Sequence, residues 1–185
     1  SQIVWNRKDW NDPAPAYANN PYWSRYVNYQ NDTRNRVYGN VGFIYYILPI
    51  LKFQYKVNLD FFSDKQFERN AVYSQEQSQY KEIARQQYEL NNEFMLLYNQ
   101  TMNDFTISGN LGANLMKRHY EMTYGRTVGG LAIADFYNLK NSVSPATAEN
   151  YLLKKAINSV FGSATFGWRS MLCLDASLRN DWSST

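Results

Sequence analysis

Two runs of strictly alternating side chains mark the centre of this chain. In residues 37–47 the odd positions carry Val, Gly, Val, Phe, Tyr and Ile. In residues 51–61 every odd position is apolar or aromatic and every even position is polar or charged. A period of two predicts β-strands whose two faces meet different environments. Each run has eleven residues, whereas strands of about five or six are usual in globular proteins and about 9–11 tilted residues cross a bilayer. The pattern therefore predicts membrane-spanning strands with one face toward lipid and the other toward a wet interior.

The same alternation returns further along the chain and divides the side chains between the two predicted faces. It is present in residues 85–98, where it is interrupted at Asn92, in residues 105–115 and in residues 160–179. We predict that the lipid-facing side chains include Val41, Phe43, Phe53, Tyr55, Val57, Leu59, Leu111 and Leu174. We predict that the lumen-facing side chains include Lys52, Gln54, Lys56, Asn58, Asp60, Glu89, Glu93, Asp175 and Arg179.

The connections between the predicted strands alternate in length. The strands form three predicted hairpins, 36–62, 85–117 and 153–185. Their internal turns are short, and the segments before and between the hairpins are long and polar: 1–34, 63–84 and 118–152. Short periplasmic turns opposite long extracellular loops are typical of bacterial outer-membrane barrels. The predicted fold class is therefore all-β, with about six long strands forming an antiparallel segment of a transmembrane β-barrel.

Composition narrows the function classes. The chain of 185 residues has a net charge of +3 without a basic block, so nucleic-acid binding is not predicted. No apolar run approaches the ~18 residues of a transmembrane helix. The single Cys173 excludes an internal disulfide framework. Because the chain begins at Ser1 without an initiator Met or a signal peptide, we expect it to be an internal piece of a longer polypeptide.

Candidate catalytic groups are few. His119 is the only histidine, so a Ser-His-Asp or Cys-His system would have to use it. The carboxylate pairs Glu89 with Glu93, or Asp60 with Asp175, have the chemistry for acid–base hydrolysis. They fall on the predicted polar face, however, where carboxylates are the ordinary lining of a barrel wall. We predict no enzymatic activity, no cofactor and no metal site.

Several short strings follow one another from residue 20 to the end of the chain. They are Asn-Pro-Tyr-Trp at 20–23, Arg-Asn-Arg-Val-Tyr-Gly-Asn-Val at 34–41, Gly-Gly-Leu at 129–131, Asp-Phe-Tyr-Asn-Leu at 135–139, Asn-Ser at 141–142, Lys-Lys-Ala-Ile-Asn-Ser-Val-Phe-Gly-Ser-Ala at 154–164, Leu-Asp at 174–175 and Arg-Asn-Asp-Trp-Ser-Ser-Thr at 179–185. In this order they resemble the SusC/RagA family of TonB-linked outer-membrane transporters.

The resemblance implies that the chain is part of the barrel domain of a transporter in the outer membrane of a Bacteroidetes-type bacterium. Such barrels have about 22 strands and a plugged lumen. Their implied partners are a SusD-like surface lipoprotein that lids the barrel, the TonB complex, outer-membrane lipids with lipopolysaccharide, and a glycan or peptide cargo. The plug domain and the TonB box, through which TonB acts at the N-terminus, are not expected in this chain.

Aromatic side chains gather in the first predicted loop. Trp5, Trp10, Tyr22 and Trp23 have the chemistry to stack on sugars or to contact the lid protein. Packing of the loop onto itself is the alternative.

Two other function classes remain open on the sequence. A soluble carbohydrate-binding β-domain with aromatic loops would require a second sheet packed on the odd-numbered face of residues 37–61. An outer-membrane barrel enzyme would require a compact set of inward catalytic residues, and the sequence offers none.

Overall fold

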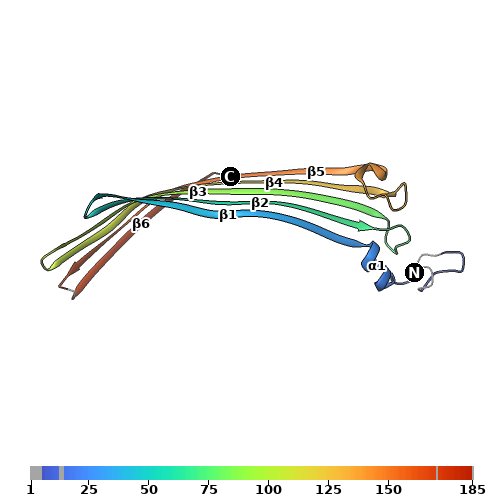
Figure 1. Ribbon diagram of the computed structural model, residues 1–185, viewed down its shortest axis with the longest axis horizontal. Coiled ribbons are helices and arrows are strands. Elements are labelled where there is room, and N and C mark those ends of the chain that lie inside the picture. The colour runs from blue at the N-terminus through green and yellow to red at the C-terminus, as the bar shows by residue number, and fades with distance from the viewer. Residues whose placement is uncertain (1–5, 13–14, 170, 185) are drawn as a thin grey trace. The chain divides into compact units, whose positions relative to one another are not determined.

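One sheet of six strands makes up most of the structure. The computed structural model describes residues 6–12, 15–169 and 171–184. The strands lie side by side in chain order in one antiparallel sheet (Figure 1). They are β1 (Tyr29–Leu48), β2 (Leu51–Asn70), β3 (Gln79–Met102), β4 (Phe105–Leu131), β5 (Ser142–Trp168) and β6 (Leu172–Ser184). This arrangement confirms the all-β, antiparallel fold with six long strands that the alternation predicted.

A short helix, α1 (Pro21–Val27), precedes the sheet. The Asn20 side chain accepts a hydrogen bond from the Tyr22 backbone N–H at 3.0 Å and so caps the helix. Pro21 occupies the first turn, where its missing N–H costs nothing. The prediction of a loop over residues 1–34 is wrong here, because seven residues are too few to show a helical apolar period. Among the described residues, no helix has the length and apolar character needed to span a membrane.

The strands run further than the alternation predicted, and the predicted loops are correspondingly shorter. The additional strand residues are 29–35, 63–70, 79–84, 118–131 and 142–152. The predicted loop between β2 and β3 is reduced to residues 71–78, and that between β4 and β5 to residues 132–141. The second connection contains the 3-10 helix η2 (Leu139–Asn141). In the extension of β2, charged and amide side chains occur at both odd and even positions. Such a strand has no apolar period, so the sequence pattern could not reveal it.

The chain forms two compact units, each with its own contacts. The loop-side unit contains the described residues up to 35, with 63–86 and 121–152. Its buried carboxylate Asp64, with a side chain only 4% exposed, lies between two arginines: Arg85 Nη1 is 3.0 Å from Oδ2, and Arg34 Nε is 3.5 Å from Oδ1. Lys81 Nζ lies 2.8 Å from Glu68 Oε2. These ion pairs join neighbouring strands whose side chains are polar on both faces.

The turn-side unit contains the described residues in 36–62, 87–120 and 153–184. Its strands meet in short turns, as the sequence predicted. Two of the turns are joined: the Arg169 backbone N–H donates to the Asp104 carbonyl at 2.8 Å, and the Arg169 guanidinium lies 2.8 Å from the Asp104 carboxylate. Asn103 and Arg169 adopt positive φ angles of 49° and 48°, which tight reversals require.

The turn-side unit has no apolar core among its described residues. The buried apolar side chains of the described chain are Pro15, Ala71, Ile83 and Leu131, and all four belong to the loop-side unit. The turn-side unit is therefore a single layer, and the soluble alternative, which required a second sheet on the odd-numbered face, finds no such sheet in the described residues.

Candidate functional site

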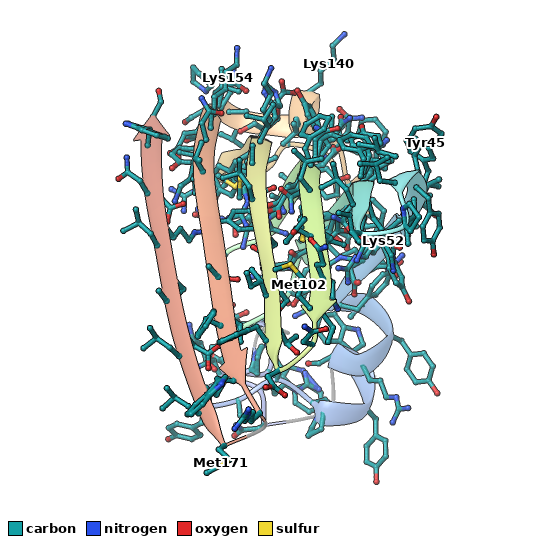
Figure 2. The ribbon with its side chains drawn as sticks, turned by 90° about the vertical axis from the view of Figure 1, so that its left-hand side faces the viewer. Tyr45, Lys52, Met102, Lys140, Lys154 and Met171 are labelled. Carbon is teal, nitrogen blue, oxygen red and sulfur yellow. The ribbon has the colours of Figure 1, made fainter. Side chains whose placement is uncertain are left out.

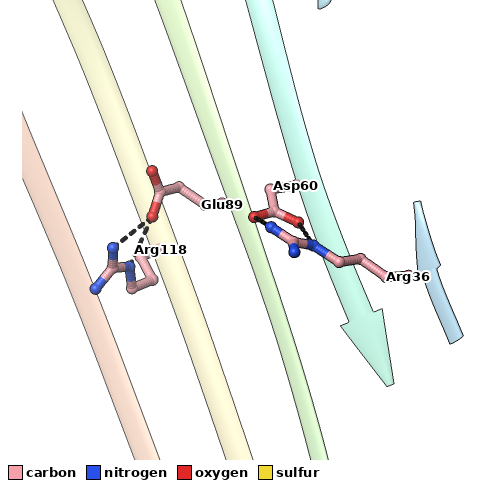
Figure 3. A network of polar contacts seen from close by, with 4 residues as sticks. All are labelled: Arg36, Asp60, Glu89 and Arg118. Carbon is pink, nitrogen blue, oxygen red and sulfur yellow. Dashed lines mark hydrogen bonds and ion pairs between the residues drawn. The ribbon is translucent and has the colours of Figure 1, made fainter. Parts of the chain in front are cut away.

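A row of four charged side chains crosses four neighbouring strands on the even-numbered face of β2. Arg36 on β1 binds Asp60 on β2 through two hydrogen bonds, Nε to Oδ1 at 2.9 Å and Nη2 to Oδ2 at 2.8 Å (Figure 3). Arg118 on β4 binds Glu89 on β3, with Nη2 2.6 Å and Nε 2.7 Å from Oε2 (Figure 3). Asp60 and Glu89 were predicted on the polar face, whereas their arginine partners were missed. Arg36 and Arg118 could only be found with the strand register in hand.

A groove of about 270 Å³ opens beside this row. It is lined in part by Arg36, Asn58, Asp60, Glu89 and Asn91. The side-chain oxygen of Asn91 is buried and accepts no hydrogen bond among the described residues. A buried amide oxygen is nearly always paired, so this atom can accept a hydrogen bond from a water molecule or from a ligand with an N–H or O–H group.

The remaining residues that we predicted on the polar face fall into two groups, those with a polar or cation–π contact and those without a hydrogen bond or ion pair. Asp175 accepts from the Thr165 hydroxyl and lies 3.7 Å from the thiol of Cys173. Arg179 binds Asp181 at 3.0 Å and donates to the Ser159 hydroxyl at 3.1 Å. Lys52 Nζ lies 5.1 Å from the centre of the Tyr46 ring. Among the predicted lumen-facing residues that the structure describes, Gln54, Lys56, Asn58 and Glu93 make no side-chain hydrogen bond or ion pair.

The opposite face of the turn-side unit carries the apolar side chains. Phe43 contacts Phe53 edge-on at 6.1 Å between ring centres. Tyr55 stacks on Phe94 at 4.8 Å. The Tyr55 hydroxyl also donates to Asn92 Oδ1 at 2.8 Å, so β3 keeps its alternation through Asn92. The interruption predicted at Asn92 is therefore one of polarity and not of strand geometry. The amide lies on the apolar face, and Tyr55 on the neighbouring β2 donates a hydrogen bond to it.

Several side chains of this apolar face are strongly exposed. Val41 is 71% exposed and Leu174 is 66% exposed. Tyr45, labelled in Figure 2, points away from its strand. The other predicted lipid-facing residues, Val57, Leu59, Leu111 among them, are half-buried or exposed as well. A continuous apolar face left uncovered in a folded chain indicates contact with another protein or a membrane.

The aromatic residues of the first segment are largely accessible. Trp5 lies outside the described residues. Trp10 is 81% exposed, with the Arg7 guanidinium 4.9 Å from its ring centre. Tyr22 is 81% exposed on α1, and its neighbour Trp23 is half-buried. The structure thus leaves Trp10 and Tyr22 accessible to a partner or ligand.

Arg69 is the centre of a cluster that the sequence did not reveal. Its guanidinium lies 3.9 Å from the centre of the Tyr29 ring and 4.5 Å from that of Tyr137. Its Nε donates to the Val27 carbonyl at 3.0 Å, and its Nη2 donates to that of Tyr26 at 3.4 Å. Burial, together with the nearby Asp135 carboxylate, raises the pKa of Tyr137. Arg69 therefore holds the end of α1 against β2 and the 132–141 connection.

The residues considered for catalysis are engaged otherwise. The His119 ring stacks on Tyr88 at 5.3 Å, with an angle of 12° between the rings. Asp60 and Glu89 each bind an arginine.

Comparison with known proteins gives one kind of match. No protein-family model matches the chain, and no curated protein is similar to it in sequence. Solved structures of the RagAB peptide importer are similar to it in fold, with TM-scores of 0.79 for the closed-closed state and 0.81 for the open-open state. A further structure, of the RagAB peptide transporter, has a TM-score of 0.74.

These matches cover 94–95% of this chain at 14% sequence identity. The chain spans 20% of the length of the chains it matches. At this identity the likeness is one of fold, and at the level of fold the resemblance expected from the sequence is confirmed.

Proposed function

We propose that this chain is part of the barrel wall of a TonB-dependent importer of the SusC/RagA type in the bacterial outer membrane. In this proposal the odd-numbered face of β2 meets lipid, and the even-numbered face lines the lumen. The wall encloses a gated pathway and carries out no bond chemistry. The rest of a barrel of about 22 strands, the plug and the TonB box belong to other parts of the protein.

One observation carries this proposal: the turn-side unit is a single layer that is apolar on one face and polar on the other. A soluble sheet buries its apolar face against a second layer, whereas a membrane barrel leaves that face to lipid and its polar face to water. The strands, of 20 to 27 residues in β1–β5, exceed what a bilayer needs. The fold match to the RagAB importer structures supports the same function.

The lumen-facing side chains suit passage of a polar cargo. The ion pairs Arg36–Asp60 and Glu89–Arg118 fix the polar side chains of four strands. The adjoining groove and the unpaired Asn91 oxygen offer a place for water, plug or cargo. We propose that the cargo is a peptide or glycan captured with a SusD-like lipoprotein, and that the exposed Trp10 and Tyr22 are available to either.

Substitution of two consecutive residues tests the proposal in the full-length protein. Val57→Arg puts a charge near the middle of the predicted lipid face and should lower the stability of the folded barrel by ~2–4 kcal/mol. Asn58→Arg adds the same charge on the opposite face and should cost much less. Folded and unfolded barrel are quantified by their different mobility in gels of unheated samples over a temperature series. Equal losses at both positions would contradict the assignment of lipid and lumen faces.

A further inference from the structure

The apolar stripe of β4 ends in positive charge on the face proposed to meet lipid. Its outward positions run from Phe105 to Leu115 and continue with Lys117 and His119. Ten residue steps at about 3.4 Å, tilted by about 40°, rise about 26 Å, which matches an apolar band about 25 Å tall. Lys117 therefore lies where this face leaves the hydrocarbon layer, at the level of the lipid headgroups.

Neighbouring strands bring further polar groups to the same level. The Arg118–Glu89 pair points to the lumen face, so Lys117, His119 and Tyr88 point outward, as the stacking of Tyr88 on His119 requires. On β5 the outward positions at this end are Ala156 and Lys154, and Ala156 is paired with Ser184 of β6. Figure 2 shows Lys154 extending away from the sheet.

A hollow of about 350 Å³ lies among these side chains. Lys117 and Lys154 are exposed at its rim, and neither makes an ion pair or hydrogen bond within the described residues. The small side chains of Ala156 and Ser184 leave the space between them open, and the Ser184 and Tyr88 hydroxyls can donate hydrogen bonds into it. Lys155 and Arg118 also line the hollow, and Arg118 is paired with Glu89, so positive charge is in excess there.

A second hollow, apolar and about 510 Å³ in volume, lies on the same outward face of β4, β5 and β6. Leu111, Val160, Leu178 and Trp182 surround it, and the small residues Gly162, Ala164 and Ala176 form its floor. In the β5–β6 register, Val160 pairs with Asn180 and Ala156 with Ser184. The two hollows are thus consecutive along the same strands, the basic one beyond the apolar one.

We propose that these two hollows hold one phosphorylated lipid, with a headgroup phosphate between Lys117 and Lys154 and an acyl chain along the apolar floor. The charge selects an anion, since two unpaired lysines and two residues with hydroxyl groups line the basic hollow. The adjacent apolar hollow selects a lipid over a free phosphate, since a free phosphate has no apolar group with which to fill it. Phosphorylated lipopolysaccharide of the outer leaflet has this chemistry. The inference rests on the proposed orientation of the wall.

The test uses the full-length transporter, purified in detergent and stripped of lipid. Native mass spectrometry measures how much lipopolysaccharide it binds, with the phosphates intact or enzymatically removed, and with inorganic phosphate as competitor. The wild-type protein should prefer the intact lipid by about tenfold or more, because each of the two lysines contributes about fivefold. An equal affinity for the dephosphorylated lipid would overturn the proposal. So would complete displacement by millimolar inorganic phosphate, which would indicate a site for a free anion.

Substitutions test whether the lipid binds at the two hollows. Lys117→Gln with Lys154→Gln should abolish the preference for the intact lipid, whereas Lys52→Gln with Lys56→Gln, the same loss of charge on the lumen face, should leave it within twofold. Ala176→Phe fills the apolar floor and should reduce binding of both lipids. An unchanged preference in the Lys117/Lys154 variant would overturn the site. If the lipid-binding test fails but Val57→Arg is much more destabilising than Asn58→Arg, the lipid site is refuted and the proposed function is still supported.

Discussion

The Tyr55 hydroxyl donates to Asn92 Oδ1 at 2.8 Å and so pairs the one amide that stands in the apolar series of β3. On the face proposed to meet lipid, the amide oxygen would have no partner without this hydrogen bond. Lipid offers no hydrogen bond in exchange, so the pair should contribute more to stability than a similar pair facing water.

Tyr55→Phe tests that contribution. It removes the donor, keeps the ring stacked on Phe94, and should lower the stability of the folded barrel by about 1–3 kcal/mol. Asn92→Leu in the Tyr55→Phe background should restore most of the loss, because the unpaired amide is then gone. The melting temperature of the full-length protein in detergent, followed by gel mobility, gives both values. Strictly additive effects of the two substitutions would show that the residues do not interact.

Gly112 leaves the space that the Phe161 ring occupies on the face proposed to line the lumen. A Cβ atom at Gly112 would overlap the ring of Phe161, which also has the Arg179 guanidinium 5.6 Å from its centre. Gly112→Ala should therefore destabilise the barrel by about 1–3 kcal/mol through forced repacking. Gly39→Ala is the matched control, since nothing lies within 4 Å of a Cβ there.

The same melting measurement separates these two glycine variants. The double variant Gly112→Ala with Phe161→Leu places a smaller side chain opposite the new methyl group. It should recover part of the stability lost in Gly112→Ala. A loss at Gly39 as large as that at Gly112 would mean that backbone entropy, and not the ring, decides the effect.

Arg69 should control the order of α1. Arg69→Met keeps the apolar stem but loses the two hydrogen bonds to the Tyr26 and Val27 carbonyls and the stacking on two rings. Cleavage by chymotrypsin after the tyrosines of α1 should become severalfold faster, because the segment opens more often. Arg69→Lys keeps the charge but loses the planar guanidinium. Its rate of chymotrypsin cleavage should therefore lie between those of the wild-type protein and Arg69→Met.

Lys81→Met provides the control for that experiment. It breaks the ion pair with Glu68 in the same unit but touches no residue of α1. Protection of α1 that is unchanged in Arg69→Met, or lost equally in Lys81→Met, would contradict a specific role for Arg69.

The alternation of side chains predicted much of the sheet but not where it ends. Lys56 and Val57 can be assigned to opposite faces because their neighbours repeat the contrast over eleven residues. Beyond Phe62 the contrast disappears, since residues such as Asp64 and Glu68 on β2 are matched by equally polar neighbours, and the strand is held by its backbone ladder and ion pairs.

The sequence also could not predict which side chains bind each other across neighbouring strands. Asp60 and Glu89 could be placed on the polar face by counting residues. That Arg36 and Arg118 bind them depends on the register between strands, which the pattern of a single strand does not contain. The Arg69 cluster is a stronger case, because Tyr29, Arg69 and Tyr137 are far apart in the chain and no shared motif joins them.

The row Arg36, Asp60, Glu89, Arg118 carries two positive and two negative charges and therefore has no net charge. A solute that passes this level of the proposed wall meets a field that cancels within a few ångströms, since each guanidinium is held by a carboxylate. Such a wall sorts solutes neither as a cation filter nor as an anion filter. Acidic and basic cargoes should pass it alike, and discrimination at this height would depend on size and hydrogen-bonding groups.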